Sequence, residues 1–258
     1  MISYAQNFED VMLWRALKDI KNGFYIDIGA NHPIEDSVTK WFYDNGWTGI
    51  NVEPEYKYFE LLQKERKRDI NLNLAVSSKL DEIELFKSNI RGWSSTNKDT
   101  LENLKNKDAL EQIVKVKTIT LDKIYQNYKL QNVHFLKIDV EGAEKDVLES
   151  FSFRKKPWII VIEATKPTTM IDVSQEWEYI LLDNGYLYVY FDGINKYYIL
   201  KEQKFLKKYF TYPPNVFDEF VDSKIVDLDK RLNQEQNKNK ELESKVNIIK
   251  DKLSLIKE

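Results

Sequence analysis

Eight residues near the start of the chain set its architecture: Phe24-Tyr25-Ile26-Asp27-Ile28-Gly29-Ala30-Asn31. The aromatic and β-branched residues of this run predict a short buried strand that ends at Gly29. The following Asn31-His32-Pro33 disfavours helix, and Asp36-Ser37 is then expected to open one. A strand, a glycine turn and a helix place Gly29 at the carboxyl end of a parallel strand, where open α/β sheets bind nucleotide-like ligands.

The turn after this strand limits the ligand that it can hold. A dinucleotide pyrophosphate needs several glycines, but Gly29 stands alone and is followed by bulky residues. A ligand with a nucleoside and no phosphate suits such a turn better, and S-adenosylmethionine is the common one. The next predicted strand, residues 48–52, ends in Glu53, which can accept hydrogen bonds from both ribose hydroxyls. These two positions predict a nucleoside site, against the simpler alternative of a plain βαβ unit with a solvated glutamate.

The composition of the chain excludes several classes of protein. Its 258 residues are 42% hydrophobic, enough for a sizeable core, and the net charge of −3 gives no basic field for nucleic acid. There is no cysteine, which removes disulfides, thiolate zinc sites and thiol nucleophiles. The first residues lack the pattern of a signal peptide, and the longest apolar run, residues 158–162, is too short to span a bilayer. We expect a cytoplasmic protein, with peripheral attachment at the inner membrane as the alternative.

Carboxylates follow three of the predicted buried strands, at residues 48–52, 133–138 and 158–162: Glu53, then Asp139 with Glu141, and Glu163. Because the carboxyl ends of parallel strands meet at one edge of a sheet, we expect these side chains to lie close together. Asp139, Glu141 and Glu163 could share a divalent cation, since hard oxygen ligands suit magnesium. The preferred interpretation contains no metal.

Further elements are expected between and after these strands. Residues 71–76 predict a third strand, and residues 82–86 and 115–118 predict an antiparallel insertion. The polar segment 92–108 inside this insertion is expected to be a mobile loop over the site. Residues 185–200 predict a hairpin that turns at Asp192-Gly193-Ile194-Asn195.

Five motifs of this chain resemble the FkbM-type methyltransferases: Tyr25-Ile26-Asp27-Ile28-Gly29-Ala30-Asn31, Asn51-Val52-Glu53-Pro54, Ala75-Val76-Ser77, Thr120-Leu121-Asp122 and Lys137-Ile138-Asp139-Val140-Glu141-Gly142-Ala143-Glu144. These are S-adenosylmethionine-dependent O-methyltransferases of the class I, Rossmann-like fold. The resemblance covers about residues 3–200. Tyr4-Ala5-Gln6-Asn7-Phe8-Glu9-Asp10 and Phe191-Asp192-Gly193-Ile194-Asn195 resemble members associated with bacterial surface-polysaccharide assembly.

The resemblance implies an α/β fold with a mostly parallel seven-stranded sheet and a C-terminal antiparallel hairpin, in a methyltransferase domain of residues 1–212. It implies transfer of a methyl group from S-adenosylmethionine to oxygen, with a sugar hydroxyl of a bacterial surface polysaccharide as acceptor. The acceptors of the family vary widely, so the reaction type is better indicated than the substrate. Two alternatives are a nicotinamide-dependent oxidoreductase, disfavoured by the lone Gly29, and a non-catalytic oligomeric scaffold with a degenerate nucleotide fold.

The expected cofactor-binding residues are Asp27, Gly29, Asn31, Glu53, Ala75, Val76 and Ser77. By resemblance, Asp27 lies near the methionine amino group, Glu53 holds the ribose, and the residues from Ala75 to Ser77 border the adenine. Gly29 and Asn31 let the backbone approach the methionine part.

A sugar hydroxyl attacks poorly unless a base takes its proton as the new bond forms. The expected candidates for this catalytic base are His32, Asp139 and Glu141. His32 is one of two histidines, and its ordinary pKa suits base work near neutral pH. The alternative for His32 is a loop residue that only bonds to backbone.

From Ile225 onward the chain changes character. Positions with three-four spacing run to the end of the chain: Ile225, Leu228, Leu232, Glu235, Asn239, Leu242, Val246, Ile249, Leu253 and Ile256. Eight of these ten a and d positions are apolar, so residues 213–258 predict a C-terminal coiled-coil oligomerisation helix. Ile249 and Ile256 at d favour a trimer over a dimer, although Asn239 at a favours a dimer. A single amphipathic helix lying on the domain is the alternative.

The segment of residues 201–214, between domain and helix, is basic and rich in aromatic residues. It predicts either a linker packed on the domain or a surface for an anionic membrane. The expected partners are a sugar or polysaccharide acceptor and further copies of this chain, with a membrane surface or a glycosyltransferase as additional candidates. The methyl group is then expected to cap a growing polysaccharide, with the coiled coil as a spacer.

Overall fold

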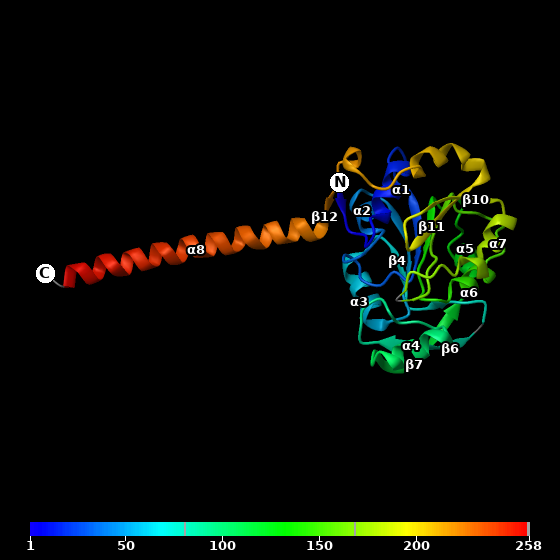
Figure 1. Ribbon diagram of the computed structural model, residues 1–258, viewed down its shortest axis with the longest axis horizontal. Helices are drawn as coiled ribbons and strands as arrows, with labels where there is room; N and C mark the ends of the chain where they lie inside the picture. Colours follow the sequence, from blue (N-terminus) through cyan, green and yellow to red (C-terminus); the bar gives the residue numbers. More distant parts are fainter. Residues whose placement is uncertain (80, 168, 257–258) are drawn as a thin grey trace.

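The computed structural model describes residues 1–79, 81–167 and 169–256, and one long helix projects from its α/β part (Figure 1). Within these residues the central sheet has seven strands in the order β10-β11-β9-β8-β2-β3-β4. The strands are β2 (Phe24–Ile28), β3 (Thr48–Val52), β4 (Ile70–Leu72), β8 (Phe135–Ile138), β9 (Ile159–Glu163), β10 (Tyr186–Phe191) and β11 (Asn195–Leu200). β11 runs antiparallel to β9 and β10, and the other neighbouring pairs are parallel. The mostly parallel sheet and the hairpin are therefore confirmed.

Successive side chains of each strand point to opposite faces of the sheet, so a hydrophobic core forms on each face. On β8, Phe135 enters one core, while Leu136 and Ile138 enter the other. The first core is covered by α1 (Glu9–Leu17), α2 (Lys40–Asp44) and the 3₁₀ helix η2 (Lys201–Phe210). The second is covered by α5 (Leu121–Asn127), α6 (Glu144–Glu149) and α7 (Glu178–Asp183), which follows the short η1 (Ser174–Glu176). Between these layers, β2, β3, β8 and β9 all end at one edge.

The strand expected over residues 71–76 is broken, which corrects that prediction. The Asn73 side chain donates to the carbonyl oxygens of Glu53 and Pro54, at 3.0 and 2.9 Å, so the chain turns out of the central sheet. The chain passes from α3 (Tyr56–Glu65) through β4 to β5 (Ala75–Val76), which joins a separate sheet. There β5 pairs with β7 (Leu110–Ile119), and β7 pairs antiparallel with β6 (Glu82–Ser88), as expected for the insertion.

Two further expectations are corrected by local backbone structure. The helix expected to open at Asp36-Ser37 begins only at Lys40, because Asp36 has a φ of +57° and so cannot belong to a right-handed helix. The segment expected to be a mobile loop contains α4 (Lys98–Asn106). Asn97 caps this helix by accepting the backbone N–H of Asp99 at 2.8 Å.

The chain after the hairpin stays on the domain until Ser223. In η2, Leu206 and Phe210 are buried, so this segment packs on the domain as a linker. The chain continues through η3 (Val216–Asp218) to β12 (Val221–Asp222), which pairs in parallel with β1 (Ile2–Ser3). No helix in the described ranges is long and apolar enough to cross a membrane.

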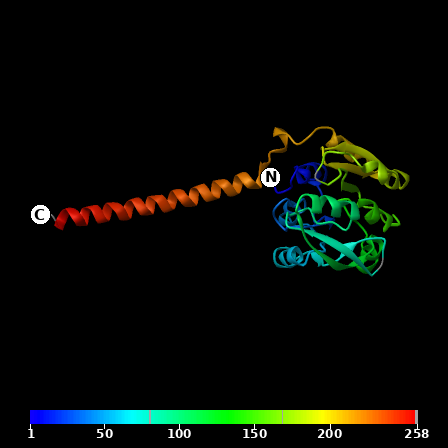
Figure 2. The same ribbon diagram turned by 60° about the horizontal axis from the view of Figure 1, so that its bottom comes forward.

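The long helix α8 (Ser223–Ile256) then leaves the domain and extends away from it in both views (Figures 1 and 2). Residues 257–258, the last two of the expected coiled-coil helix, lie outside the described residues. The helix is therefore present from Ser223, whereas residues 213–222 of the expected segment contain η3 and β12 instead, which corrects its predicted start. The coiled coil requires further copies of the chain and stays a prediction.

Only glycine fits at position 29, in the turn after β2. Gly29 has a φ of +76°, and a Cβ added there would lie 1.8 Å from the carbonyl oxygen of Asp139. The Gly29 N–H donates to Val52 O at 3.0 Å, and the Asp139 N–H donates to Ile28 O at 3.1 Å. The turn is thus held between the ends of β3 and β8, with no room for a side chain.

We expect Gly29→Ala to lower the free energy of unfolding more than a matched glycine substitution. Gly193, in the hairpin turn, has a φ of +102° and nothing within 4 Å of an added Cβ. Gly193→Ala therefore carries only the conformational cost, on the order of 1–3 kcal/mol. Gly29→Ala adds a clash with backbone and should be worse by at least ~1 kcal/mol in urea titrations, or fail to fold. Equal losses would show that the close approach is unimportant.

Candidate functional site

A cavity of about 210 Å³ opens at the edge of the sheet where β2, β3 and β8 end. Loops after these strands line it, together with residues of the antiparallel insertion. Several site residues that were predicted from the sequence line this cavity: Gly29, Asn31, Glu53, Ala75, Val76, Asp139 and Glu141. Residues from distant parts of the chain therefore converge on one site, as expected for the carboxyl edge of an open sheet.

Asp27 and Ser77 lie next to this cavity rather than in its lining. Asp27 is 1% exposed, accepts a hydrogen bond from Thr39 Oγ1 at 3.2 Å, and lies 3.4 Å from Lys137 Nζ. Ser77 is fully buried and donates its hydroxyl to Asp146 at 2.5 Å. Both side chains thus have structural partners, and their direct contact with a cofactor stays a prediction.

His32 is also absent from the lining. Its Nδ1 accepts the backbone N–H of Glu35 at 3.0 Å and that of Ile34 at 3.3 Å, and burial lowers the pKa of the ring. This geometry matches the alternative of a loop histidine that bonds to backbone. The catalytic role of His32 stays a prediction.

The Glu53 carboxylate is held in place by two backbone N–H groups. Its carboxylate is 5% exposed and accepts the N–H of Asn31 at Oε2 and that of Glu55 at Oε1, both at 2.8 Å. Asn31 takes a left-handed φ of +48°, in the tight turn that brings its N–H to Glu53. Each carboxylate oxygen has two acceptor positions, so one on each remains for a ligand. Burial raises the pKa of Glu53 to about 7, although the two N–H groups lower it.

Lys137 lines the cavity and has a structural role that the sequence pattern does not predict. Its Nζ donates to Gly29 O at 2.9 Å and lies 3.2 Å from Asp139 Oδ2 and 3.4 Å from Asp27 Oδ1. Burial lowers its pKa, but Asp139 and Asp27 outweigh this and raise it, so the side chain stays charged. The sequence feature that could have indicated this role is a single charged residue inside the otherwise apolar strand Phe135–Ile138.

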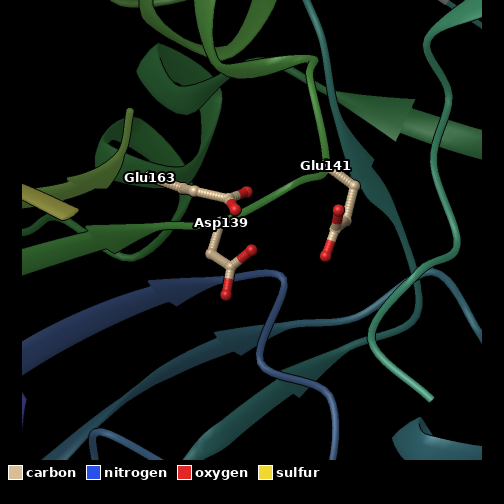
Figure 3. Close-up of side chains that lie close together, drawn as sticks. All are labelled: Asp139, Glu141 and Glu163. Carbon is tan, nitrogen blue, oxygen red and sulfur yellow. The ribbon is translucent and has the colours of Figure 1, made fainter. Parts of the chain in front are cut away.

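The carboxylates at the ends of β8 and β9 form a cluster. Asp139, Glu141 and Glu163 each offer an oxygen within 4.8 Å of the others (Figure 3). Burial, and then the charge of Asp139, raises the pKa of both Glu141 and Glu163 well above its usual range. Oxygens this close can share a proton or a divalent cation, so the interpretation without a metal stays a prediction.

The antiparallel insertion completes one side of the cavity, where Arg91 and residues 92–96 contribute to the lining. Arg91 forms ion pairs with Glu35, at 3.2 Å, and with Asp36, both of which also line the cavity. The cavity therefore has a polar rim, and apolar side chains from Leu74, Val76 and Leu85 face another part of it.

The family model described as the methyltransferase FkbM domain matches residues 27–188 of this chain. No curated protein matches the sequence. Among solved structures, the chain is similar to a TehB-like SAM-dependent methyltransferase from Corynebacterium glutamicum, with 7% identity, coverage of 75% of this chain and 88% of that chain, and a TM-score of 0.43.

Two other structures are comparably distant. An O-methyltransferase from Bacillus cereus in complex with SAH has 13% identity, coverage of 77% and 80%, and a TM-score of 0.39. A precorrin-6y C5,15-methyltransferase from Geobacter metallireducens has 13% identity, coverage of 71% and 72%, and a TM-score of 0.38. At these values no substrate can be transferred to this chain, and the family match stands on the sequence alone.

We expect Lys137→Met to destabilise the protein by about 3–5 kcal/mol, because it leaves Asp27 buried without a positive partner. Adding Asp27→Asn should recover part of this loss, since the double variant no longer buries that charge. The free energy of unfolding at pH 7, measured in urea, checks both expectations.

The matched control is Lys145→Met. Lys145 is 47% exposed and faces Glu149 at 4.0 Å, and removing such a surface pair should change stability by less than ~1 kcal/mol. Equal effects of Lys137→Met and Lys145→Met, or no recovery with Asp27→Asn, would contradict the structural role of Lys137.

Proposed function

The chain belongs to the FkbM methyltransferase family, and on that premise we propose that it methylates a sugar hydroxyl of a bacterial surface polysaccharide. S-adenosylmethionine is its cofactor and supplies a methyl group bonded to a sulfonium sulfur. In the proposed transfer an oxygen–carbon bond forms, the sulfur–carbon bond breaks, and the hydroxyl loses its proton. The protein must therefore position two ligands and accept that proton.

The cofactor side of the proposal is supported by the chemistry of the cavity. Glu53 has two free acceptor positions for a pair of neighbouring ribose hydroxyls, and Asn31 and Glu55 hold its carboxylate in place. The apolar residues Leu74, Val76 and Leu85 provide a wall on which an adenine ring can lie. These residues fit a nucleoside without phosphate groups.

The acceptor side is supported by a contact between two segments. Asn7 donates its side-chain amide to Asp192 O at 3.1 Å, and Asn195 donates to Glu9 Oε1 at 2.9 Å. These residues belong to the two motifs that resemble polysaccharide-linked members of the family. The first motif also carries Gln6 to the cavity lining.

The polar rim of the cavity is the main observation that favours a sugar as the methyl acceptor. Gln6, Glu35, Asp36, Arg91 and Ser94 supply both donors and acceptors there. Arg91 already pairs with Glu35 and Asp36, and the hydroxyl groups of a sugar can add further hydrogen bonds to such a polar rim. The experiment that tests the choice is transfer of a labelled methyl group to oligosaccharides prepared from surface polysaccharide.

Glu141 is the base that we propose for the hydroxyl proton. It lines the cavity, and burial together with the charge of Asp139 raises its pKa, so that its carboxylate, once deprotonated, takes up a proton more readily than an ordinary glutamate does. Asp139 also lines the cavity, but its carboxylate is paired with Lys137 Nζ at 3.2 Å and is less free to turn toward a hydroxyl group. His32 is not among the residues that line the cavity, and its Nδ1 already accepts two backbone N–H groups, so Glu141 is the candidate that we prefer.

We expect binding of the cofactor product to depend on pH through Glu53. Its pKa of about 7 means that the free protein carries mostly protonated Glu53 at pH 6 and mostly carboxylate at pH 8. Ribose hydroxyls bind better to the carboxylate, so affinity for S-adenosylhomocysteine should be about tenfold weaker at pH 6 than at pH 8. Glu53→Gln cannot titrate and should bind weakly at both pH values. Calorimetry that finds the same pH dependence in both proteins would refute the ribose assignment.

The second prediction concerns the base. Glu141→Gln should bind S-adenosylhomocysteine within about twofold of the wild type but transfer methyl groups roughly 10²–10⁴-fold more slowly to the same oligosaccharides. His32→Asn is the matched control and should retain most of the activity, since its ring lies outside the cavity lining.

Two outcomes would contradict this assignment of the base. An active Glu141→Gln variant with an inactive His32→Asn variant would return the role to His32. Loss of wild-type activity in EDTA, restored by Mg²⁺, would instead assign the cluster of Asp139, Glu141 and Glu163 to a cation.

A further inference from the structure

We propose that α8 joins copies of this chain into a parallel homo-oligomer, with the cavities gathered around the base of the joined helices. The proposal concerns an interaction surface and does not depend on the substrate. Its occupant is the same helix from further copies of the chain.

The first observation is an exposed apolar stripe along α8. The side chains of Ile225, Leu228, Leu232, Leu242, Val246 and Ile249 are between 48% and 64% exposed. The helix has 34 residues and extends away from the domain in both views (Figures 1 and 2). Contiguous exposed apolar side chains on a soluble protein mark an interaction surface. A helix of this length also gains most of its stability from packing, which the domain does not provide.

The second observation is the width of this stripe. The apolar residues lie at positions with alternating steps of three and four, the a and d positions of a coiled coil, of which only Glu235 and Asn239 are polar. Outside these positions, α8 has only Val226, Ile248 and Leu255 as apolar residues. A helix that docks on the flank of a globular partner needs a wider apolar face. The narrow stripe therefore fits a helix of the same kind.

Charges beside the stripe indicate copies that run in parallel. Every g position is basic: Lys224, Arg231, Lys238, Lys245 and Lys252. In an antiparallel pair the g positions of the two helices face each other, which would set a basic row against a basic row. In a parallel assembly each g position instead faces an e position five residues on, so Lys238 meets Glu243 of the next copy, and Lys245 with Lys250 is a like-charge pair nearer the end of the helix. Ile249 at d favours three helices over two.

The base of α8 is fixed to the rim of the cavity. Lys224, in the first turn, lies 3.2 Å from Asp36 Oδ1, and Asp36 also pairs with Arg91. Asp36 and Arg91 both line the cavity. The preceding strand β12 is held by its pairing with β1. Joining the helices therefore brings the rims of the cavities around one axis, where a single long acceptor can reach more than one of them.

The test compares two double variants of the full chain by size-exclusion chromatography with light scattering at micromolar concentration. Leu232→Glu/Leu242→Glu places charges in the apolar stripe. Asn237→Glu/Ser244→Glu adds the same charge at f positions, on the opposite face of the helix. The wild type and the f-position variant should have three times the 30.7 kDa mass of one chain, and the stripe variant should have the mass of one chain.

Binding of S-adenosylhomocysteine by the stripe variant, with wild-type affinity, would show that its domain is folded. A wild type with the mass of one chain would overturn the proposal. So would a stripe variant that keeps the wild-type mass, because the domain would then hold the assembly together. A wild-type mass of two chains that falls to one in the stripe variant would support the joining of helices and make the assembly a dimer.

Orientation can be tested separately because the chain contains no cysteine. Leu232→Cys, at an a position, should form disulfide-linked chains on mild oxidation only when equivalent positions meet in a parallel arrangement. Lys230→Cys, at the neighbouring f position, is the control and should stay unlinked. An oligomer in which Leu232→Cys does not cross-link would overturn the parallel arrangement.

Discussion

The buried ammonium group of Lys137 holds together the strand ends on which the site depends. It extends from β8 and contacts Asp27 and the Gly29 carbonyl on β2, as well as Asp139 at its own strand end. A buried carboxylate such as Asp27 is unfavourable without a positive partner, so this lysine makes the charged edge of the sheet stable. It also fixes the position of the Gly29 turn beside Asp139, and these two residues line one wall of the cavity.

Around this contact, the other carboxylates of the site lie in two different surroundings. Glu53 and Asn31 lie on one side, where the carboxylate is oriented by backbone N–H groups before any ligand arrives. Glu141 and Glu163 lie on the other, where burial and neighbouring negative charges favour the protonated forms. The carboxylates at this edge of the sheet are therefore held differently, since backbone N–H groups bond to Glu53 and Lys137 pairs with Asp139.

Residues whose role follows from their own conformation or position along a strand could be predicted from the sequence. Gly29, Glu53 and the strands around them are of this kind, since a turn and a strand end are local features. Lys137 could not be assigned, because its role depends on Asp27 from another strand. The break at Asn73 depends on hydrogen bonds to the carbonyl groups of Glu53 and Pro54. Asp36, which has a left-handed backbone conformation, pairs with Arg91 and Lys224, and both are distant from it in the sequence. These three features depend on contacts between distant segments, which a local sequence pattern does not contain.

We propose that the cavity binds S-adenosylmethionine with its ribose on Glu53 and its reactive sulfur near the carboxylate cluster. A crystal structure of the full chain with S-adenosylhomocysteine tests this most directly. We predict both ribose hydroxyls within hydrogen-bond distance of the Glu53 carboxylate, and the sulfur on the side of Asp139 and Glu141. A ligand bound outside this cavity, or a sulfur that points away from those carboxylates, would contradict the account.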